Sequence, residues 1–414
     1  MDIWHVRGGR KLSGSIRVQG SKNASLPIIA ASIVSPMECV LLNTPKLRDV
    51  DAALKILRHL GCKAEMSGNQ LYIDSRPLSL SHIPPSLMEE MRSSVIFMGA
   101  LLARCGEARL SPPGGCQLGE RPIDLHLKSL RELGAQIDEE DGEIYCKGGD
   151  LKGTSISLPF PSVGATENIL LAACAAKGKT HLSGAAREPE IVALAEFLRT
   201  AGAEISGDGT DNIDIEGFRP RKYVLNRIIP DRIAGATLCC ACAACGGDIQ
   251  LKGGEFSSVL YFLNQAGCDI ISGTHSLRVV SQGKLRAVKG IQTAPYPGFP
   301  TDAQPVLMAA LLKAAGESSI EENIFRNRFR HVPELRRMGA RIDIEGKTAL
   351  IRGVRELHGT ALNSTDLRGG AAMIISALSA EGESVIMDEG HVRRGYERFD
   401  EALRALGGEI YLET

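Results

Sequence analysis

The chain has 414 residues, of which 43% are hydrophobic and 23% are charged, and its formal net charge is −1. That composition is typical of a globular protein in water, and the length favours two domains over one. A net charge near zero gives no overall attraction to nucleic acid or to an anionic membrane, so any bound anion must be held by local cations. The first residues lack the order of a signal peptide, and no segment reaches the ~18 apolar residues of a membrane span. We therefore expect a cytoplasmic protein with no nucleic-acid or membrane partner.

The predicted elements begin with a strand over residues 12–18, which precedes a repeated pattern and is assigned to the second domain. The pattern is a helix that ends in Leu-x-x-x-Gly and is followed by a short alternating strand. Glycine suits the end of a helix because it adopts the left-handed conformation without a Cβ clash. The pattern occurs six times, ending at Gly61, Gly134, Gly202, Gly267, Gly339 and Gly407.

Each repeat also contains a second helix that is apolar on nearly all sides, which predicts that it is buried. These helices begin near Ser25, Arg92, Thr166, Arg232, Ala303 and Gly369. A period of about 70 residues is too long for a propeller blade or a common solenoid repeat. It fits a unit of two helices and about four strands. Six such units predict an α/β protein of two domains with three units each, divided between residues 219 and 229.

Four of the six buried helices carry a basic residue at their start, where the helix dipole disfavours positive charge. The four are Lys22, Arg92, Arg232 and Arg368. One such base alone is typical of a solvated surface, but the recurrence favours helix ends that converge on an anionic ligand. The neighbouring Asp231 and Asp366 offer a simpler interpretation, in which each caps and neutralises its helix.

The other two helix starts have no base. One follows a turn of small residues, 160–166, whose backbone can approach a ligand closely. The other ends in Asp302, within Pro297-Gly298-Phe299-Pro300-Thr301-Asp302. Asp302 is either the N-cap of its helix or a general base beside an anion-binding site.

Most of the eleven cysteines lie in apolar sequence, as Cys174 and Cys105 do, which predicts free thiols packed in a core. A cluster of four suggests a metal site at first sight. Its members are Cys239, Cys240, Cys242 and Cys245. Their alanine-rich helical sequence and the lack of a second ligand pair favour a buried helix instead.

Cys116 differs from the other cysteines because its surroundings are rich in glycine and proline, which is typical of a loop. It is either a tolerated loop cysteine or a functional thiol whose thiolate form is favoured by the nearby Arg121. His126 follows closely, but spacing alone does not establish a Cys–His pair.

Seven segments carry a resemblance to a known family. They are Gly20-Ser21-Lys22-Asn23-Ala24, Pro45-Lys46-Leu47-Arg48-Asp49-Val50-Asp51, Pro113-Gly114-Gly115-Cys116, Gly119-Glu120-Arg121-Pro122-Ile123-Asp124-Leu125-His126, Pro297-Gly298-Phe299-Pro300-Thr301-Asp302, Asn327-Arg328-Phe329 and Arg394-Gly395-Tyr396-Glu397-Arg398. Together they resemble the UDP-N-acetylglucosamine 1-carboxyvinyltransferases along essentially the whole chain. The resemblance implies a two-domain inside-out α/β barrel that binds its substrates between the domains. It places one domain at residues 21–229, with the cysteine loop, and the other at residues 1–20 and 230–414.

The resemblance also implies an activity. The enolpyruvyl group of phosphoenolpyruvate would be transferred to the 3-hydroxyl of UDP-N-acetylglucosamine with release of phosphate, the first committed step of peptidoglycan precursor synthesis. Asp302 would take the hydroxyl proton, and Cys116 would protonate C3 of phosphoenolpyruvate and can form an adduct with it. Lys22, Arg121 and Arg394 would hold the phosphate and carboxylate of phosphoenolpyruvate.

The remaining implied roles concern the acceptor. The sugar nucleotide would be held by Asn23, Arg92, Arg121, Pro122, Ile123, Asp124, Leu125, Ser162, Val163, Gly164, Asp302 and Ile324. Arg328 and Arg368 would line the same cleft. An acid, a base and several cations suffice for the chemistry, so no metal or organic cofactor is expected.

Three positions depart from the family's usual residues: Ala234 and Arg326 stand where glutamate is common, and Arg393 stands where an acid is common. Two alternative functions are open. A 5-enolpyruvylshikimate-3-phosphate synthase shares the fold and the donor, but that family lacks the Pro-Gly-Gly-Cys loop. A non-catalytic UDP-sugar-binding paralogue would share the fold alone, and it would not need the combination of bases, cysteine and aspartate described above.

Overall fold

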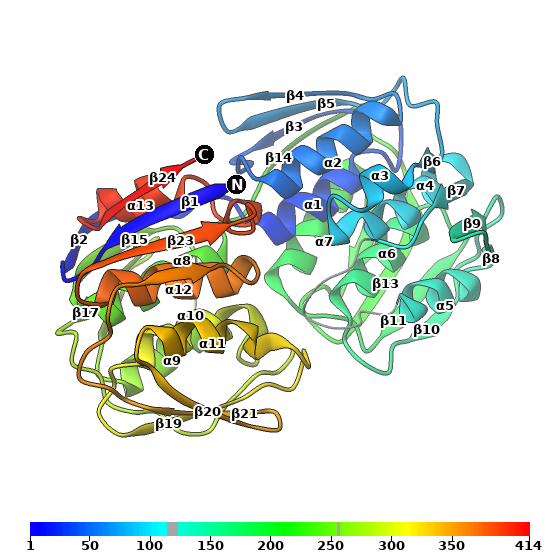
Figure 1. The fold of residues 1–414 in the computed structure, drawn as a ribbon. Coiled ribbons are helices and arrows are strands. Elements are labelled where there is room, and N and C mark those ends of the chain that lie inside the picture. The colour runs from blue at the N-terminus through cyan, green and yellow to red at the C-terminus, as the bar shows by residue number, and fades with distance from the viewer. Residues whose placement is uncertain (114–122, 255–256) are drawn as a thin grey trace. The chain divides into compact units, whose positions relative to one another are not determined.

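The structure is a computed structural model that describes residues 1–113, 123–254 and 257–414. The described residues form two compact units (Figure 1). Residues 20–113 and 123–229 make up the N-terminal unit, and residues 1–19 and 230–414 make up the C-terminal unit. Each unit has its own hydrophobic core. Among the described helices, none has the length and hydropathy needed to cross a membrane.

The strands that the structure describes in the N-terminal unit form three four-stranded sheets. The first sheet contains β3 (Glu38–Leu42), β4 (Lys63–Ser67), β5 (Gln70–Asp74) and β14 (Tyr223–Arg227). The second contains β6 (His82–Ile83), β7 (Glu107–Leu110), β8 (Gln136–Glu140) and β9 (Glu143–Lys147). The third contains β10 (Ser155–Ser157), β11 (Lys179–Ser183), β12 (Ala203–Ser206) and β13 (Asn212–Phe218).

Within the described part of the C-terminal unit there are also three four-stranded sheets. The first contains β2 (Leu12–Arg17), β15 (Gly247–Lys252), β16 (Asp269–Ser272) and β17 (Ser276–Ser281). The second contains β18 (Ile291–Gln292), β19 (Glu317–Glu321), β20 (Arg341–Glu345) and β21 (Thr348–Arg352). The third contains β1 (Asp2–Arg7), β22 (Ala361–Asn363), β23 (Glu383–Asp388) and β24 (Glu409–Glu413).

All of these sheets share one topology. In the first sheet, β14 runs parallel to β3, β3 pairs antiparallel with β5, and β5 pairs antiparallel with β4. Strands distant in sequence complete several sheets: β14 joins β3, β2 joins β15 in parallel, and β1 lies between β23 and β24. The strand predicted over residues 12–18 therefore belongs to the C-terminal unit.

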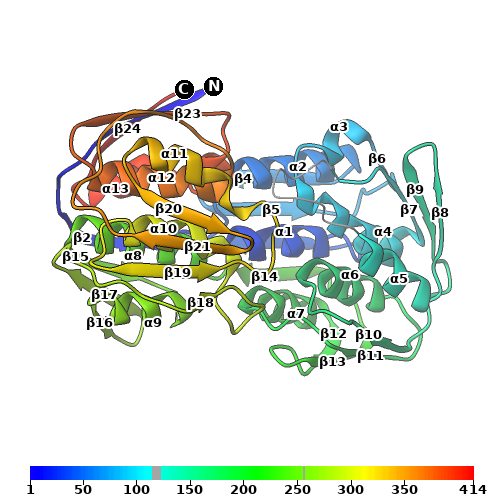
Figure 2. The same ribbon diagram turned by 60° about the horizontal axis from the view of Figure 1, so that its bottom comes forward.

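The apolar helices lie inside their units, with the sheets around them (Figures 1 and 2). In the N-terminal unit they are α1 (Lys22–Ala31), η1 (Arg92–Ile96) continued by α4 (Phe97–Cys105), and α6 (Val163–Ala173). In the C-terminal unit they are α8 (Arg232–Cys245), η2 (Thr301–Ala303) continued by α10 (Gln304–Leu311), and α12 (Leu367–Ser379). In α8 every residue from Ile233 to Ala244 is buried, which confirms that the cysteine cluster belongs to a buried helix.

The second set of helices has one polar face. Its members are α2 (Arg48–His59), α5 (Asp124–Glu132), α7 (Pro189–Ala201), α9 (Ser257–Gln265), α11 (Val332–Arg337) and α13 (Phe399–Ala405). The glycines predicted to end them have φ between +91° and +116°, as a left-handed helix end requires. Three short helical elements precede longer helices in the chain: α3 (Pro85–Met88), η3 (Arg328–His331) and η4 (Val392–Arg394). The architecture is a two-unit inside-out α/β barrel.

One prediction about the cysteines was wrong. Cys105, which the apolar sequence placed in a core, is exposed. It is the last residue of α4, and the left-handed Gly106 that follows ends the helix at the surface. Cys174 is buried as predicted, and burial raises the pKa of its thiol to about 12.

Candidate active site

In the N-terminal unit, Lys22 is fixed at the start of α1. Ser21 caps the helix, since its hydroxyl accepts a hydrogen bond from a first-turn amide. The Nζ atom of Lys22 lies 2.8 Å from Oδ2 of Asp49, which is buried in the first turn of α2. This ion pair fixes the ammonium group at the start of α1. Asn23 lies next to it in the same first turn.

A second group of predicted residues meets around His126, on α5. Asn168 donates a hydrogen bond from Nδ2 to Nδ1 of His126 over 2.7 Å, and another to the carbonyl of Val95 in η1 over 3.1 Å. On the opposite side, a Cβ built on Gly164 would lie 2.9 Å from Cε1 of His126. His126 thus joins the start of α5, which carries Ile123 to Leu125, to the turn of Ser162, Val163 and Gly164.

The electrostatics around His126 are those of a site that already carries positive charge. Burial and then the nearby positive charge of Arg92 lower its pKa to about 4, against the opposing effect of Asp124. The ring is therefore neutral at pH 7, and because Nδ1 accepts from Asn168 the network assigns the proton to Nε2. Its Nε2–H is a donor close to the start of α6.

In the C-terminal unit, Asp302 lies between two arginines. Its Oδ1 atom accepts from Nη2 of Arg328 at 2.8 Å, and its Oδ2 atom accepts from Nη2 of Arg368 at 3.0 Å. The arginine side chains are 1% and 2% exposed, whereas that of Asp302 is 31% exposed. Asp302 is the middle residue of η2, and the N-cap positions of η2 and α10 are Pro300 and Ala303. The structure therefore does not support the N-cap interpretation of Asp302.

The two arginines are themselves anchored. Arg328 donates from Nε and Nη2 to the carbonyl of Thr301, at 3.0 and 2.9 Å. Arg368 lies over the ring of Tyr396, 5.3 Å from its centre, and the Tyr396 hydroxyl lies 2.9 Å from that of Thr237. Such buried contacts fix both guanidinium groups before any substrate binds.

Asp231 and Asp366 act as helix caps, as the simpler interpretation of these residues predicts. Each accepts hydrogen bonds from two amides of its own helix, α8 or α12. Burial disfavours the charged form of Asp366, yet the nearby Arg328 holds the pKa of this carboxyl below its usual value. The amide of Ala234 is one of the donors to Asp231, at 2.9 Å.

Arg394 lies at the end of η4. The preceding Asp388 holds this turn, because its two oxygens accept from the amides of His391 and Val392 at 3.0 and 3.1 Å. The adjacent Arg393 makes a bidentate ion pair with the buried Asp2, at 2.7 and 2.8 Å. The basic residue at position 393 therefore has a local acidic partner on β1.

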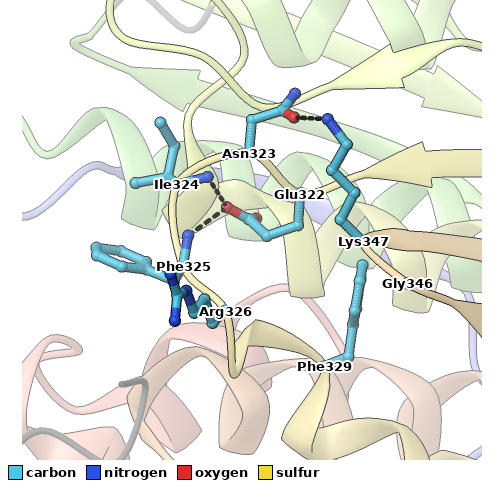
Figure 3. A pocket seen from close by; sticks show the side chains of 8 residues that line it. All are labelled: Glu322, Asn323, Ile324, Phe325, Arg326, Phe329, Gly346 and Lys347. Carbon is cyan, nitrogen blue, oxygen red and sulfur yellow. Dashed lines mark hydrogen bonds between the residues drawn. The ribbon is translucent and has the colours of Figure 1, made fainter. Parts of the chain in front are cut away.

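Ile324 lies on the wall of a pocket of about 460 Å³ within the C-terminal unit (Figure 3). The pocket is lined by Glu322, Asn323, Ile324, Phe325, Arg326, Phe329, Gly346 and Lys347. The wall is the segment of residues 322–327, which links β19 to η3. Arg326, the second departure from the family pattern, is exposed at this segment.

The structure brings Asp302, Arg328 and Arg368 together in the C-terminal unit, and in the N-terminal unit the predicted residues lie in two groups. Cys116, Arg121 and Pro122 lie outside the described residues. Sequence reasoning did not single out Asp49, Asn168 or Glu322, because their partners lie far away along the chain. Among the described residues, no group of His, Cys, Asp or Glu has the arrangement of a metal site.

Comparisons with known proteins concern the fold and the family. The family described as EPSP synthase (3-phosphoshikimate 1-carboxyvinyltransferase) matches residues 6–403. Among solved structures, the enolpyruvyl transferase NikO from Streptomyces tendae has a TM-score of 0.89 and 25% identity, covering 100% of this chain and 99% of that one. The EPSP synthase from Acinetobacter baumannii has a TM-score of 0.76 at 21% identity, covers 100% of both chains, and supports the fold alone.

The chain belongs to the enolpyruvyl transferase family. Within that family, it is similar to the UDP-N-acetylglucosamine 1-carboxyvinyltransferase 2 of Caldanaerobacter subterraneus subsp. tengcongensis, with 45% identity over 99% of both chains. It is 44% identical to the UDP-N-acetylglucosamine 1-carboxyvinyltransferase of Geotalea daltonii, again over 99% of both chains.

Proposed function

We propose that this chain is an enzyme that transfers the enolpyruvyl group of phosphoenolpyruvate to the 3-hydroxyl of UDP-N-acetylglucosamine, a step of peptidoglycan precursor synthesis. The observation that carries the proposal is Asp302, a partly exposed carboxylate held by two buried arginines. This arrangement combines a base with cations, as addition of a hydroxyl to an anionic enol ether requires. The full-length similarity to enzymes with this name supports the same activity.

The donor would be held mainly by cations. Lys22, fixed by Asp49, would contact the phosphate of phosphoenolpyruvate, together with Arg121 and Arg394. These groups would also stabilise the negative charge on the departing phosphate. No metal or organic cofactor is part of the proposal.

The acceptor would be held by residues of both units. In the N-terminal unit these are Asn23, Arg92, Arg121, Pro122, Ile123, Asp124, Leu125, Ser162, Val163 and Gly164. In the C-terminal unit they are Asp302 and Ile324, beside Arg328 and Arg368. The neutral His126 would supply a further donor, because its Nε2–H lies close to the start of α6.

The reaction would proceed by addition and elimination. Asp302 would accept the proton of the 3-hydroxyl as its oxygen bonds to C2 of phosphoenolpyruvate, and Cys116 would donate a proton to C3. The tetrahedral intermediate would then lose a proton from C3, form the C2–C3 double bond again, and expel phosphate. We propose that the enzyme acts in the cytoplasm.

Phosphate release from phosphoenolpyruvate tests the function directly. We expect release within a single turnover when UDP-N-acetylglucosamine is present, and none when it is omitted. Shikimate 3-phosphate in its place tests the alternative acceptor, which we expect to give no release. Binding of UDP-N-acetylglucosamine without phosphate release would instead indicate a non-catalytic paralogue and would overturn the proposal.

A further inference from the structure

The segment of residues 322–327 has no regular secondary structure, yet it carries Ile324 and leads directly into Arg328. Thr293 accepts from the amide of Asn323 at 2.8 Å, and the side chain of Glu322 holds the next two amides. The amides of Ile324 and Phe325 both donate to Oε1 of Glu322, at 2.8 and 3.0 Å (Figure 3). The conformation of the pocket wall therefore depends on this carboxylate.

The same carboxylate ties the segment to two other parts of the unit. Thr293 donates from its hydroxyl to Oε1 of Glu322 at 3.0 Å, and Thr301 donates to Oε2 at 3.0 Å. Glu322 is 5% exposed. Oε1 thus accepts three hydrogen bonds and Oε2 accepts one, so both oxygens of the carboxylate are bound. Hydrogen bonds to an ionised acceptor are stronger than those between neutral groups, which makes the cluster stiff.

Thr301 is held from two directions. Glu322 binds its hydroxyl, and Arg328 binds its carbonyl oxygen at 2.9 to 3.0 Å. Arg328 also binds Asp302, the residue that follows Thr301. Glu322, at the start of the irregular segment, and Arg328, directly after it, thus both bind the turn that carries Asp302. A movement of Glu322 would reach Asp302 through the single peptide bond between Thr301 and Asp302.

We propose that Glu322 is a positioning residue, which aligns Asp302 with the acceptor hydroxyl and fixes the Ile324 wall against the sugar nucleotide. The inference rests on the proposed function. Glu322 would not react; it would set where the base and the wall lie. Misplacement of a reacting group by about 1 Å costs up to roughly a hundredfold in rate, so the effect should be measurable.

Glu322→Gln is the main test because it preserves shape while replacing one acceptor oxygen with a donor. The new NH₂ group would face a hydroxyl that now donates to the carboxylate, or it would displace the two amides. We expect kcat to fall about tenfold or more and KM for UDP-N-acetylglucosamine to rise about tenfold. KM for phosphoenolpyruvate should stay within about twofold, because Glu322 binds Thr301, Ile324 and Phe325, which lie beside the proposed base and acceptor site.

Glu321→Gln is the matched control. The carboxylate of Glu321 is next in sequence but lies at the partly exposed end of β19, where it pairs with Lys347 and accepts from Gln292. The Glu321→Gln variant should keep kcat, KM for UDP-N-acetylglucosamine and KM for phosphoenolpyruvate within about twofold of the parent values. The proposal is overturned if Glu322→Gln matches this control, or if it changes KM for both substrates equally.

A second pair of variants keeps the inference testable if Glu322→Gln does not fold. Thr301→Val removes the hydroxyl that links Glu322 to the base, and Thr301→Ser keeps it. We expect kcat to fall about tenfold in the valine variant and to stay within about twofold in the serine variant. Equal losses in both would overturn the inference. A parent protein without any turnover would instead contradict the proposed function itself.

Discussion

The carboxylate of Asp302 accepts a hydrogen bond from the buried guanidinium of Arg328 over 2.8 Å. The arginine is 1% exposed and cannot turn away into solvent, whereas the carboxylate is 31% exposed. The other oxygen of Asp302 accepts from Nη2 and Nε of Arg368, at 3.0 and 3.3 Å. These hydrogen bonds fix the direction in which the carboxylate points.

Asp302→Asn should preserve the binding of UDP-N-acetylglucosamine but lower turnover by about a hundredfold or more, as loss of a positioned base usually does. Steady-state phosphate release measures the turnover, and titration calorimetry measures the binding of UDP-N-acetylglucosamine. Asp343→Asn is a suitable control, because it breaks an exposed Asp–Arg pair in the same unit. Turnover within about threefold of the parent would show that Asp302 only contributes to binding.

Cys116 should be alkylated by a small epoxide phosphonate that mimics phosphoenolpyruvate, such as fosfomycin in this family. The cations that hold the phosphate would also direct the electrophile to the thiol. Cys116→Asp should keep activity and resist alkylation, since a carboxylic acid still donates a proton. Cys116→Ser should lose most activity, because a hydroxyl is a much weaker acid.

Cys105 provides the internal control for that experiment. It is the exposed thiol among the described cysteines, and partial burial together with neighbouring Glu107 raises its pKa despite the opposing charge of Arg104. It should therefore react slowly with the epoxide although reagent can reach it. Peptide mass spectrometry locates the adduct. Modification of Cys105 with loss of activity, while Cys116 remains unmodified, would contradict the assignment.

Local sequence predicted the repeat well because its signal is local. A helix that ends at Gly61 or Gly339 needs a positive φ at that residue, whatever the rest of the chain does. The contacts between residues of the candidate site could not be predicted in this way. Arg368 contacts Asp302 across 66 residues, and no pattern within either helix encodes that pairing. The predicted burial of Cys105 was wrong for a related reason, because the preceding Leu-Leu-Ala does not reveal which side of the helix end faces solvent.

His126 should make the N-terminal unit sensitive to acid. Its pKa is about 4 in the folded chain, because of burial and then Arg92, against about 6.5 when unfolded. Between these values the unfolded chain binds the extra proton, so stability falls as pH falls from 6.5 to 4. The full loss is roughly 3 kcal/mol once both states are protonated, and there is no loss above pH 6.5.

His126→Gln removes this titration, so its thermal unfolding midpoint should depend less steeply on pH between 6.5 and 4 than that of the parent. Circular dichroism at a series of pH values measures the difference. His181→Gln serves as the control, because that histidine is half-exposed and bound to Asp214 on a sheet of the same unit. Parallel curves for His126→Gln and the parent would rule out the buried neutral imidazole.

Gly164 should be required for acceptor binding because it allows α6 to start against His126. A methyl group there would lie 2.9 Å from Cε1 and 3.2 Å from Nε2 of the imidazole, closer than carbon atoms normally approach. Asn168 fixes that ring from the other side, so Gly164→Ala must displace the turn of residues 162–164. We expect KM for UDP-N-acetylglucosamine to rise about tenfold, with KM for phosphoenolpyruvate little changed. Gly149→Ala is the matched control, since nothing lies within 4 Å of its new methyl group. An unchanged KM for UDP-N-acetylglucosamine in Gly164→Ala would show that this turn does not contribute to acceptor binding.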